Sequence, residues 1–107
     1  MKRRCHADVD DDAPLDGLAK ALCAISSPAE MRAFLEDLCT PAELEAMSDR
    51  WRVVPLLLQG VPYREIHDRT LVSVTTVGRV ARTLERGAGG YNAAVRRSAA
   101  PRPARAR

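Results

Sequence analysis

The chain has 107 residues, of which 46% are hydrophobic. This length allows one domain with tails, and a single copy of such a domain can bury only a small core. Its net charge of +3 hides an asymmetry: residues 1–47 carry five Lys or Arg against ten Asp or Glu, and residues 48–107 carry twelve against four. The basic second half favours a polyanionic partner. No run of 18 apolar residues is present and acidic residues follow the Met-Lys-Arg-Arg start, which excludes a membrane span and a secretory signal and predicts a cytoplasmic protein.

The cysteines do not indicate a metal site or a disulfide framework. Cys5, Cys23 and Cys39 are too far apart for a CxxC pair, and their number is odd. We expect reduced thiols, with Cys23 and Cys39 packed as small apolar side chains. Paired carboxylates in an apolar setting, a nucleophile with a base and a phosphate-binding loop are also missing, so we predict neither an enzyme nor a cofactor.

Three helices are predicted in the first 60 residues, after an acidic tail at 1–13 that we expect to be disordered. The first begins at Pro14 and ends before Ser26, with an apolar stripe of Leu15, Leu18, Leu22 and Ile25. The second has Ser27 as N-cap, Pro28 at its first position and Glu30 as the capping-box acid. These signals predict two amphipathic helices in quick succession.

The third predicted helix begins with the same kind of capping signals. Thr40 is its N-cap and Pro41 its first residue, and its apolar seam runs as far as Gly60 through Leu44, Met47, Trp51, Val54 and Leu58. Pro55 lacks the N–H that an α-helix requires, so we expect it to kink this helix or to end its regular part.

Beyond Gly60 the pattern predicts two short helices at about 63–70 and 74–86. A glycine-rich turn at 87–90, a turn of helix at 91–97 and a Pro/Ala/Arg-rich tail at 98–107 follow. We expect this basic tail to be disordered and its three arginines to add phosphate contacts. The predicted domain therefore covers residues 14–97.

The two short helices form a helix-turn-helix pattern. Its apolar positions, spaced as two helices that cross over one small core, are Ile66, Val72, Val77 and Val80. Ser73 is placed to cap the second helix, which leaves polar and basic residues facing outward. The predicted DNA-binding residues are Arg64, Ser73, Thr75, Thr76, Arg79 and Arg82.

These residues have different expected roles. Arg64, Thr76 and Arg82 are expected to bind phosphates, whereas Thr75 and Arg79 are expected to contact bases, with Arg79 bidentate to guanine. Ordinary solvated helix residues are the alternative interpretation.

Three positions depart from a standard helix-turn-helix. His67 occupies a usually small position where the helices approach, and Leu71 occupies a turn position usually filled by glycine. A positive φ at Leu71 costs about 1 kcal/mol or more, so we expect a distorted turn. Gly78 makes the second helix less stable than alanine would. The alternative interpretation is that the glycine allows close approach to the DNA backbone. For His67 we expect a packed or solvent-facing side chain rather than a ligand or pH sensor.

Several stretches together resemble a known family. They are Phe34–Met47, Arg50, Leu56–Gly60, Tyr63–Ile66 and Gly89–Tyr91. From about Leu15 to Arg97 the chain is similar to the Trp-repressor-like family usually called YerC/YecD. This resemblance implies an all-α, intertwined homodimer whose recognition helices lie about 34 Å apart and read a roughly palindromic site on double-stranded DNA.

The Trp repressor family proper is similar at Thr40-Pro41, at Arg50 and at Thr76–Arg79. Thr40, Arg50 and Arg79 are therefore candidates for effector binding, because Arg50 and Arg79 match the arginines that flank the indole of the corepressor. Val80 stands where that family has glycine, and its side chain would fill space that the ligand needs, which argues against tryptophan. Arg50 beside Glu45 and Asp49 is equally open to a surface ion pair or an interface contact.

Two functions thus follow from the sequence. The first is a sequence-specific, homodimeric transcription regulator, in particular a repressor. The alternative is a dimeric interaction or scaffold protein whose degenerate helix-turn-helix binds DNA only non-specifically, and His67, Leu71 and Gly78 favour it.

Overall fold

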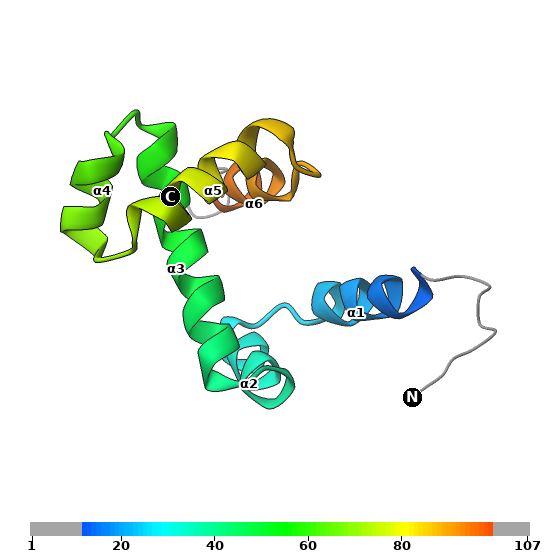
Figure 1. The fold of residues 1–107 in the computed structure, drawn as a ribbon. Coiled ribbons are helices and arrows are strands. Elements are labelled where there is room, and N and C mark those ends of the chain that lie inside the picture. Colours follow the sequence, from blue (N-terminus) through cyan, green and yellow to red (C-terminus); the bar gives the residue numbers. More distant parts are fainter. Residues whose placement is uncertain (1–11, 100–107) are drawn as a thin grey trace, which may run out of the picture. The chain divides into compact units, whose positions relative to one another are not determined.

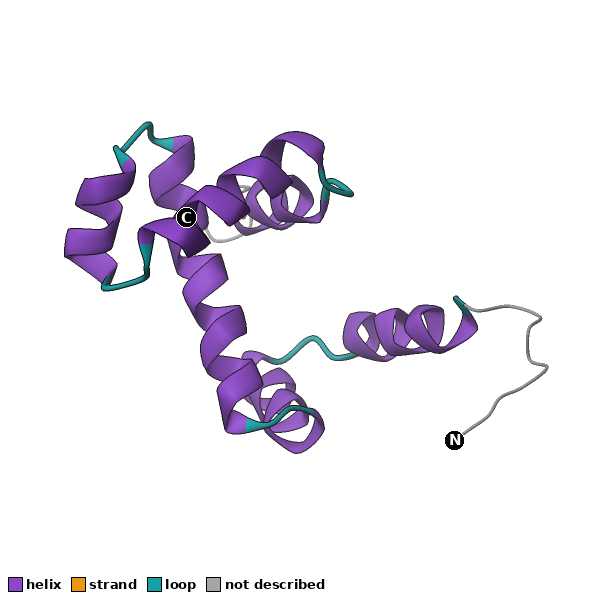
Figure 2. Cartoon of the chain, viewed as in Figure 1, coloured by secondary structure: helices purple, strands orange, loops and turns teal. Residues whose placement is uncertain are grey.

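The computed structural model of the protein describes residues 12–99, which form six helices and no strand (Figures 1 and 2). The all-α prediction is therefore confirmed. The predicted tails at 1–13 and 98–107 lie largely outside the described residues, as does Cys5. Among the residues that are described, no helix is long and apolar enough to span a membrane. The helices fall into two compact units, Met1–Pro41 and Ala42–Arg107.

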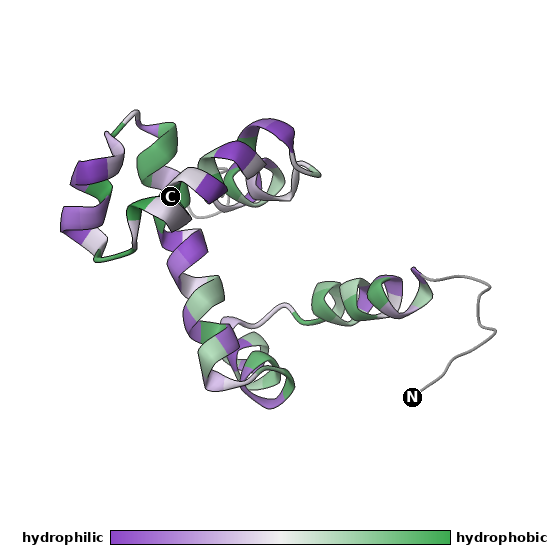
Figure 3. Ribbon diagram, in the orientation of Figure 1, coloured by the Kyte–Doolittle hydropathy of each residue, from purple (hydrophilic) through white to green (hydrophobic). Residues whose placement is uncertain are grey.

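The first unit contains α1 (Ala13–Ala24) and α2 (Pro28–Leu38). The predicted cap of α2 is confirmed, because the Glu30 N–H donates to Ser27 Oγ at 3.2 Å. Both helices mix hydrophobic and hydrophilic segments, as Figure 3 shows, yet neither has a buried residue. Cys23 is exposed rather than packed, since α1 has no core around it, and Cys39 is half-buried. The apolar faces of this unit are therefore incompletely covered in a single copy.

The second unit contains most of α3 (Pro41–Leu58), then α4 (Tyr63–Thr70), α5 (Val74–Arg86) and α6 (Gly90–Ala99). In Figure 1 the last three helices lie around the C-terminal part of α3. The core is a single cluster of six buried side chains: Val53, Val54, Ile66, Val72, Val77 and Val80. The four core positions predicted for the helix-turn-helix all belong to it.

Two predictions for α3 can be compared with the structure. Of the two outcomes expected at Pro55, an end of the helix is not observed, because α3 continues to Leu58 and the Gln59 N–H donates to the Pro55 carbonyl at 3.0 Å. Residues on both sides of Pro55 pack on the same core, and this burial outweighs the missing hydrogen bond. The predicted seam is also shifted, because Val53 is fully buried whereas Trp51 is exposed.

The connection between α5 and α6 is the predicted glycine-rich turn. Gly87 is the C-cap of α5 and Gly89 has a φ of +88°, in the left-handed region that glycine adopts without cost. The last helix begins at Gly90 and is longer than the predicted turn at 91–97. Its Tyr91 and Val95 pack against the core and explain why this segment stays helical.

Candidate nucleic-acid interface

Helices α4 and α5 meet through a three-residue turn with a left-handed residue at its start. Leu71 has φ 67° and ψ 6°, and its N–H donates to the His67 carbonyl at 2.7 Å. Leu71 therefore adopts the positive φ whose cost led us to expect a differently shaped turn. The expected distortion of the turn is wrong, because Leu71 itself adopts the left-handed conformation that glycine would provide.

Side chains from α4 hold the middle residue of this turn. Thr70 Oγ1 donates to the Ile66 carbonyl at 2.7 Å and accepts the Val72 N–H at 3.1 Å. His67 Nδ1 lies 2.9 Å from the Val72 carbonyl oxygen. Since the Val72 side chain is buried, all parts of this residue are fixed. The turn thus places the start of α5 at a defined position relative to α4.

The N-terminus of α5 is capped as predicted. Ser73 Oγ accepts the Thr76 N–H at 3.1 Å, and the two hydroxyl oxygens of Ser73 and Thr76 lie 3.0 Å apart. If Ser73 donates in this pair, the Thr76 hydroxyl proton remains available for an external acceptor such as a phosphate oxygen. Thr76 is half-buried rather than fully outward.

One face of α5 is polar, exposed and basic. Four exposed residues at spacings of four, three and four follow this face, opposite the buried valines: Thr75, Arg79, Arg82 and Arg86. None of these arginines forms an ion pair within residues 12–99. Arg86 is absent from the predicted set, although its spacing from Arg82 and Arg79 would have placed it there. We name these four residues the basic stripe.

Helix α4 carries two arginines, of which only Arg64 belongs to the predicted DNA contacts. Arg64 is exposed and forms no ion pair in the part of the chain that the structure describes, whereas Arg69 is bonded to Glu65 with N–O distances of 3.1 and 2.5 Å. Arg64 is therefore available to a phosphate, and Arg69 is already partly neutralised.

Gly78 lies beside Tyr63, the first residue of α4. A Cβ added at Gly78 would be 3.7 Å from Tyr63 Cε2, an ordinary contact distance. Packing within the fold therefore does not require a glycine at position 78.

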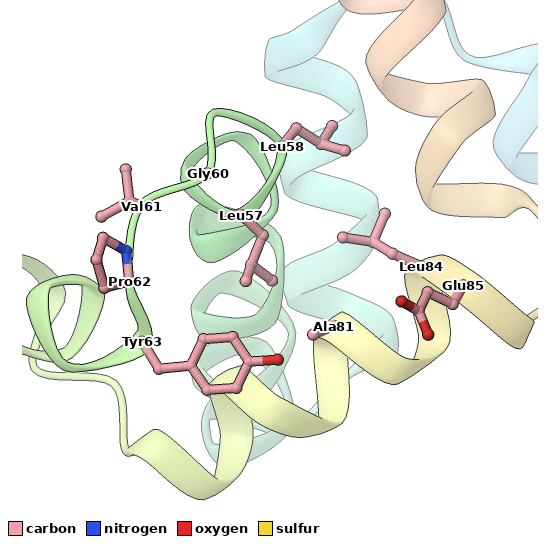
Figure 4. Close-up of a pocket in the computed structure, with 9 residues that line it drawn as sticks. All are labelled: Leu57, Leu58, Gly60, Val61, Pro62, Tyr63, Ala81, Leu84 and Glu85. Carbon is pink, nitrogen blue, oxygen red and sulfur yellow. The ribbon is translucent and has the colours of Figure 1, made fainter.

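A groove lined in part by Tyr63 is mainly apolar. It has a volume of about 470 Å³ and lies between the end of α3, the following loop and α5 (Figure 4). Tyr63 and Glu85 are its polar residues, and Leu84 and Ala81 form the α5 wall. None of the predicted effector-binding residues lines it.

The predicted effector residues fall in both units. Thr40 belongs to the first unit, and Arg50 and Arg79 belong to the second, so their joint site stays a prediction. Arg50 is half-buried and forms no ion pair within the described range; its neighbour Asp49 instead faces Arg52, at 4.0 Å. Val80 is 1% exposed and packs in the core. Within residues 12–99 no group of three His, Cys, Asp or Glu side chains is arranged to hold a metal ion.

Comparison with known proteins gives two matches. The family model described as Trp repressor protein matches residues 13–99. The chain is also 32% identical, over 83 residues, to a protein from Bacillus subtilis (strain 168) described as uncharacterized protein YerC. This alignment covers 78% of the present chain and 80% of the relative. The family match includes the whole of α4, the turn and α5.

Proposed function

Since the chain belongs to the Trp repressor family, we propose that it is a sequence-specific DNA-binding transcription regulator that acts as a homodimer through α4 and α5. We expect it to repress rather than activate. The observation that carries this proposal is the basic stripe, whose three arginines are exposed and unpaired in the described chain, on a helix held rigidly by its turn.

The stripe suits DNA because it combines two kinds of contact. Arginines along an exposed helix face bind phosphates through charge, and an arginine near the start of that helix can bond both acceptors of a guanine edge. We assign Arg79 and Thr75 to base contacts. Phosphate contacts are assigned to Arg64, Thr76, Arg82 and Arg86, and Ser73 is assigned the orientation of the Thr76 hydroxyl.

The homodimer is proposed from the apolar side chains that a single copy leaves uncovered. Neither α1 nor α2 has a buried residue, and their apolar faces include the exposed Leu15 and Leu38. On α3, Trp51 and Leu58 are also exposed. Large apolar side chains left exposed on three successive helices are the kind of surface that a dimer interface would cover. Light scattering should give a dimer at micromolar concentration, and a stable monomer would contradict this part of the proposal.

Tryptophan is not expected as corepressor. The Val80 side chain is part of the core, so making room for an indole there would require the core to repack. If a small-molecule effector exists, we expect Thr40, Arg50 and Arg79 to contact it. Calorimetric titration of the protein with tryptophan should therefore show no binding, and saturable binding would overturn this expectation.

The first experiment is selection of random duplex DNA by the purified protein at low and near-physiological salt. A specific site resists salt better than phosphate binding does, so we expect a palindromic motif to be recovered at both salt concentrations. Binding that disappears with salt and yields no motif would favour the alternative, a scaffold protein with non-specific DNA affinity.

Two arginine variants then distinguish base recognition from phosphate binding. Arg79→Ala should weaken binding to the selected site by about 1–3 kcal/mol and relax the base preference at one position. Arg82→Ala is the matched control, because it removes an arginine from the same stripe and should weaken all duplexes alike. Equal losses on every sequence for both variants would contradict base reading by Arg79.

A further inference from the structure

The turn between α4 and α5 carries two large apolar side chains that the fold does not use. Leu71 is 81% exposed and Val74 is 44% exposed, whereas Val72 between them is 4% exposed. We call Leu71 and Val74 the apolar tip. Three residues of chain span at most about 11 Å, so the Cα atoms of Leu71 and Val74 lie within the length of roughly three base pairs.

Leu71 is unfavourable for the folded chain in two respects. Its φ of 67° is a conformation that glycine adopts at less cost, and its side chain is exposed to solvent instead of packing. Residues in such conformations occur preferentially where a binding or catalytic role needs them. A leucine here is explained if its side chain is covered when a partner binds.

The charges around the apolar tip indicate which partner this is. Asp68 is exposed three residues before Leu71, but α4 and α5 together carry five arginines against three acidic residues, so their net charge is positive. Arg79 and Arg82 are exposed on α5 and have no acidic partner among the described residues, and Thr75 directly follows Val74. An apolar protein surface placed here would have to cover unneutralised cations, which costs free energy. The major groove of DNA instead offers apolar thymine methyl groups within a polyanionic surface.

We propose that Leu71 and Val74 contact the 5-methyl groups of thymines in the major groove and so contribute to sequence preference. This inference rests on the proposed function. It adds two specificity-determining residues to Thr75 and Arg79, and it predicts which atoms of the DNA they read. Because 5-methylcytosine carries a methyl group at the same ring position, it should satisfy the same contact.

The test uses the full chain and the duplex selected above, with each thymine of one half-site replaced in turn by deoxyuridine. This change removes only the methyl group. We expect roughly fourfold weaker binding at one or two positions, the factor that corresponds to one buried methyl group. At the same positions, a C·G pair with 5-methylcytosine should bind more tightly than one with unmethylated cytosine.

The variants Leu71→Gly and Val74→Ala assign the effect to the apolar tip. Each should abolish the thymine-against-uracil difference at its own position and leave the other position unchanged. Leu71→Gly keeps the left-handed turn, so it should fold, and thermal unfolding of both variants checks this.

Each remaining outcome overturns the inference. Equal binding of thymine and uracil duplexes by the unchanged protein would do so while leaving the proposed function intact. The same holds if both variants keep the uracil effect, which would assign methyl reading to another residue such as Thr75. A change of oligomeric state in Leu71→Gly would identify a second copy as the partner of the tip. Failure to recover any DNA motif would overturn the proposed function together with the inference.

Discussion

His67 Nδ1 lies 2.9 Å from the backbone carbonyl oxygen of Val72, across the left-handed residue Leu71. A carbonyl oxygen only accepts, so the imidazole donates its Nδ1–H. Because the Val72 N–H is bonded to Thr70 Oγ1, α4 side chains satisfy both backbone polar groups of this buried residue. The histidine that the sequence suggested was too large for its position is therefore a support of the turn.

Loss of the His67 contact should destabilise the protein. His67→Ala leaves the Val72 carbonyl without its donor, and we expect the free energy of unfolding to fall by about 1–2 kcal/mol. Urea denaturation followed by circular dichroism measures this. Asp68→Ala is the control, since Asp68 is exposed on the same helix and should change stability by less than about 0.5 kcal/mol. Equal effects of the two substitutions would show that the hydrogen bond is not a support.

Replacing Leu71 by glycine should stabilise the free protein. Leu71→Gly removes the cost of a positive φ in a side chain that makes little contact with the fold, so the free energy of unfolding should rise by about 1 kcal/mol. Leu71→Ala keeps a Cβ and should give no such gain. If both variants unfold at the same denaturant concentration, the backbone conformation is not the source of the effect.

Gly78→Ala should separate stability from DNA binding. A Cβ fits 3.7 Å from Tyr63 Cε2, and alanine is the better helix former by about 1 kcal/mol, so α5 should become more stable. We expect DNA affinity to fall nonetheless, because a glycine at this position would let the DNA backbone approach closely and an added Cβ would hinder that approach. Thermal unfolding and fluorescence anisotropy on the selected duplex measure the two quantities. An affinity that stays unchanged would contradict the role given to Gly78.

Gly87→Ala should do the opposite and destabilise the end of α5. The added Cβ would lie 2.6 Å from the Thr83 carbonyl oxygen and 2.7 Å from Thr83 Cγ2, closer than real atoms approach, so the backbone must shift. We expect a loss of about 1–3 kcal/mol in thermal or urea unfolding. Gly90→Ala is the matched control, because a Cβ there meets no atom within 4 Å. A Gly87→Ala variant as stable as Gly90→Ala would contradict this packing.

Much of the helix-turn-helix could be predicted from sequence because its signals are local. Ser27 and Ser73 are capping residues directly before an amphipathic pattern, and both accept the expected N–H. The four apolar core positions of α4, the turn and α5 follow from helical spacing, and all four are buried. Arg86 belongs to the same helical face as Arg79. It was not among the predicted residues, although its spacing from Arg79 and Arg82 in the sequence places it on that face.

The sequence by itself determined the helices, the caps at Ser27 and Ser73 and the core of the helix-turn-helix, since each depends on residues within a few positions of one another. Only the tertiary structure decided which face of α3 is buried, because Val53 and Val54 are selected over Trp51 by contact with α4 and α5. It also decided that α3 continues past Pro55, that Leu71 takes the left-handed conformation and that His67 supports the turn. These outcomes depend on distant packing and on side-chain hydrogen bonds, and the apolar periodicity of the sequence carries no information about either.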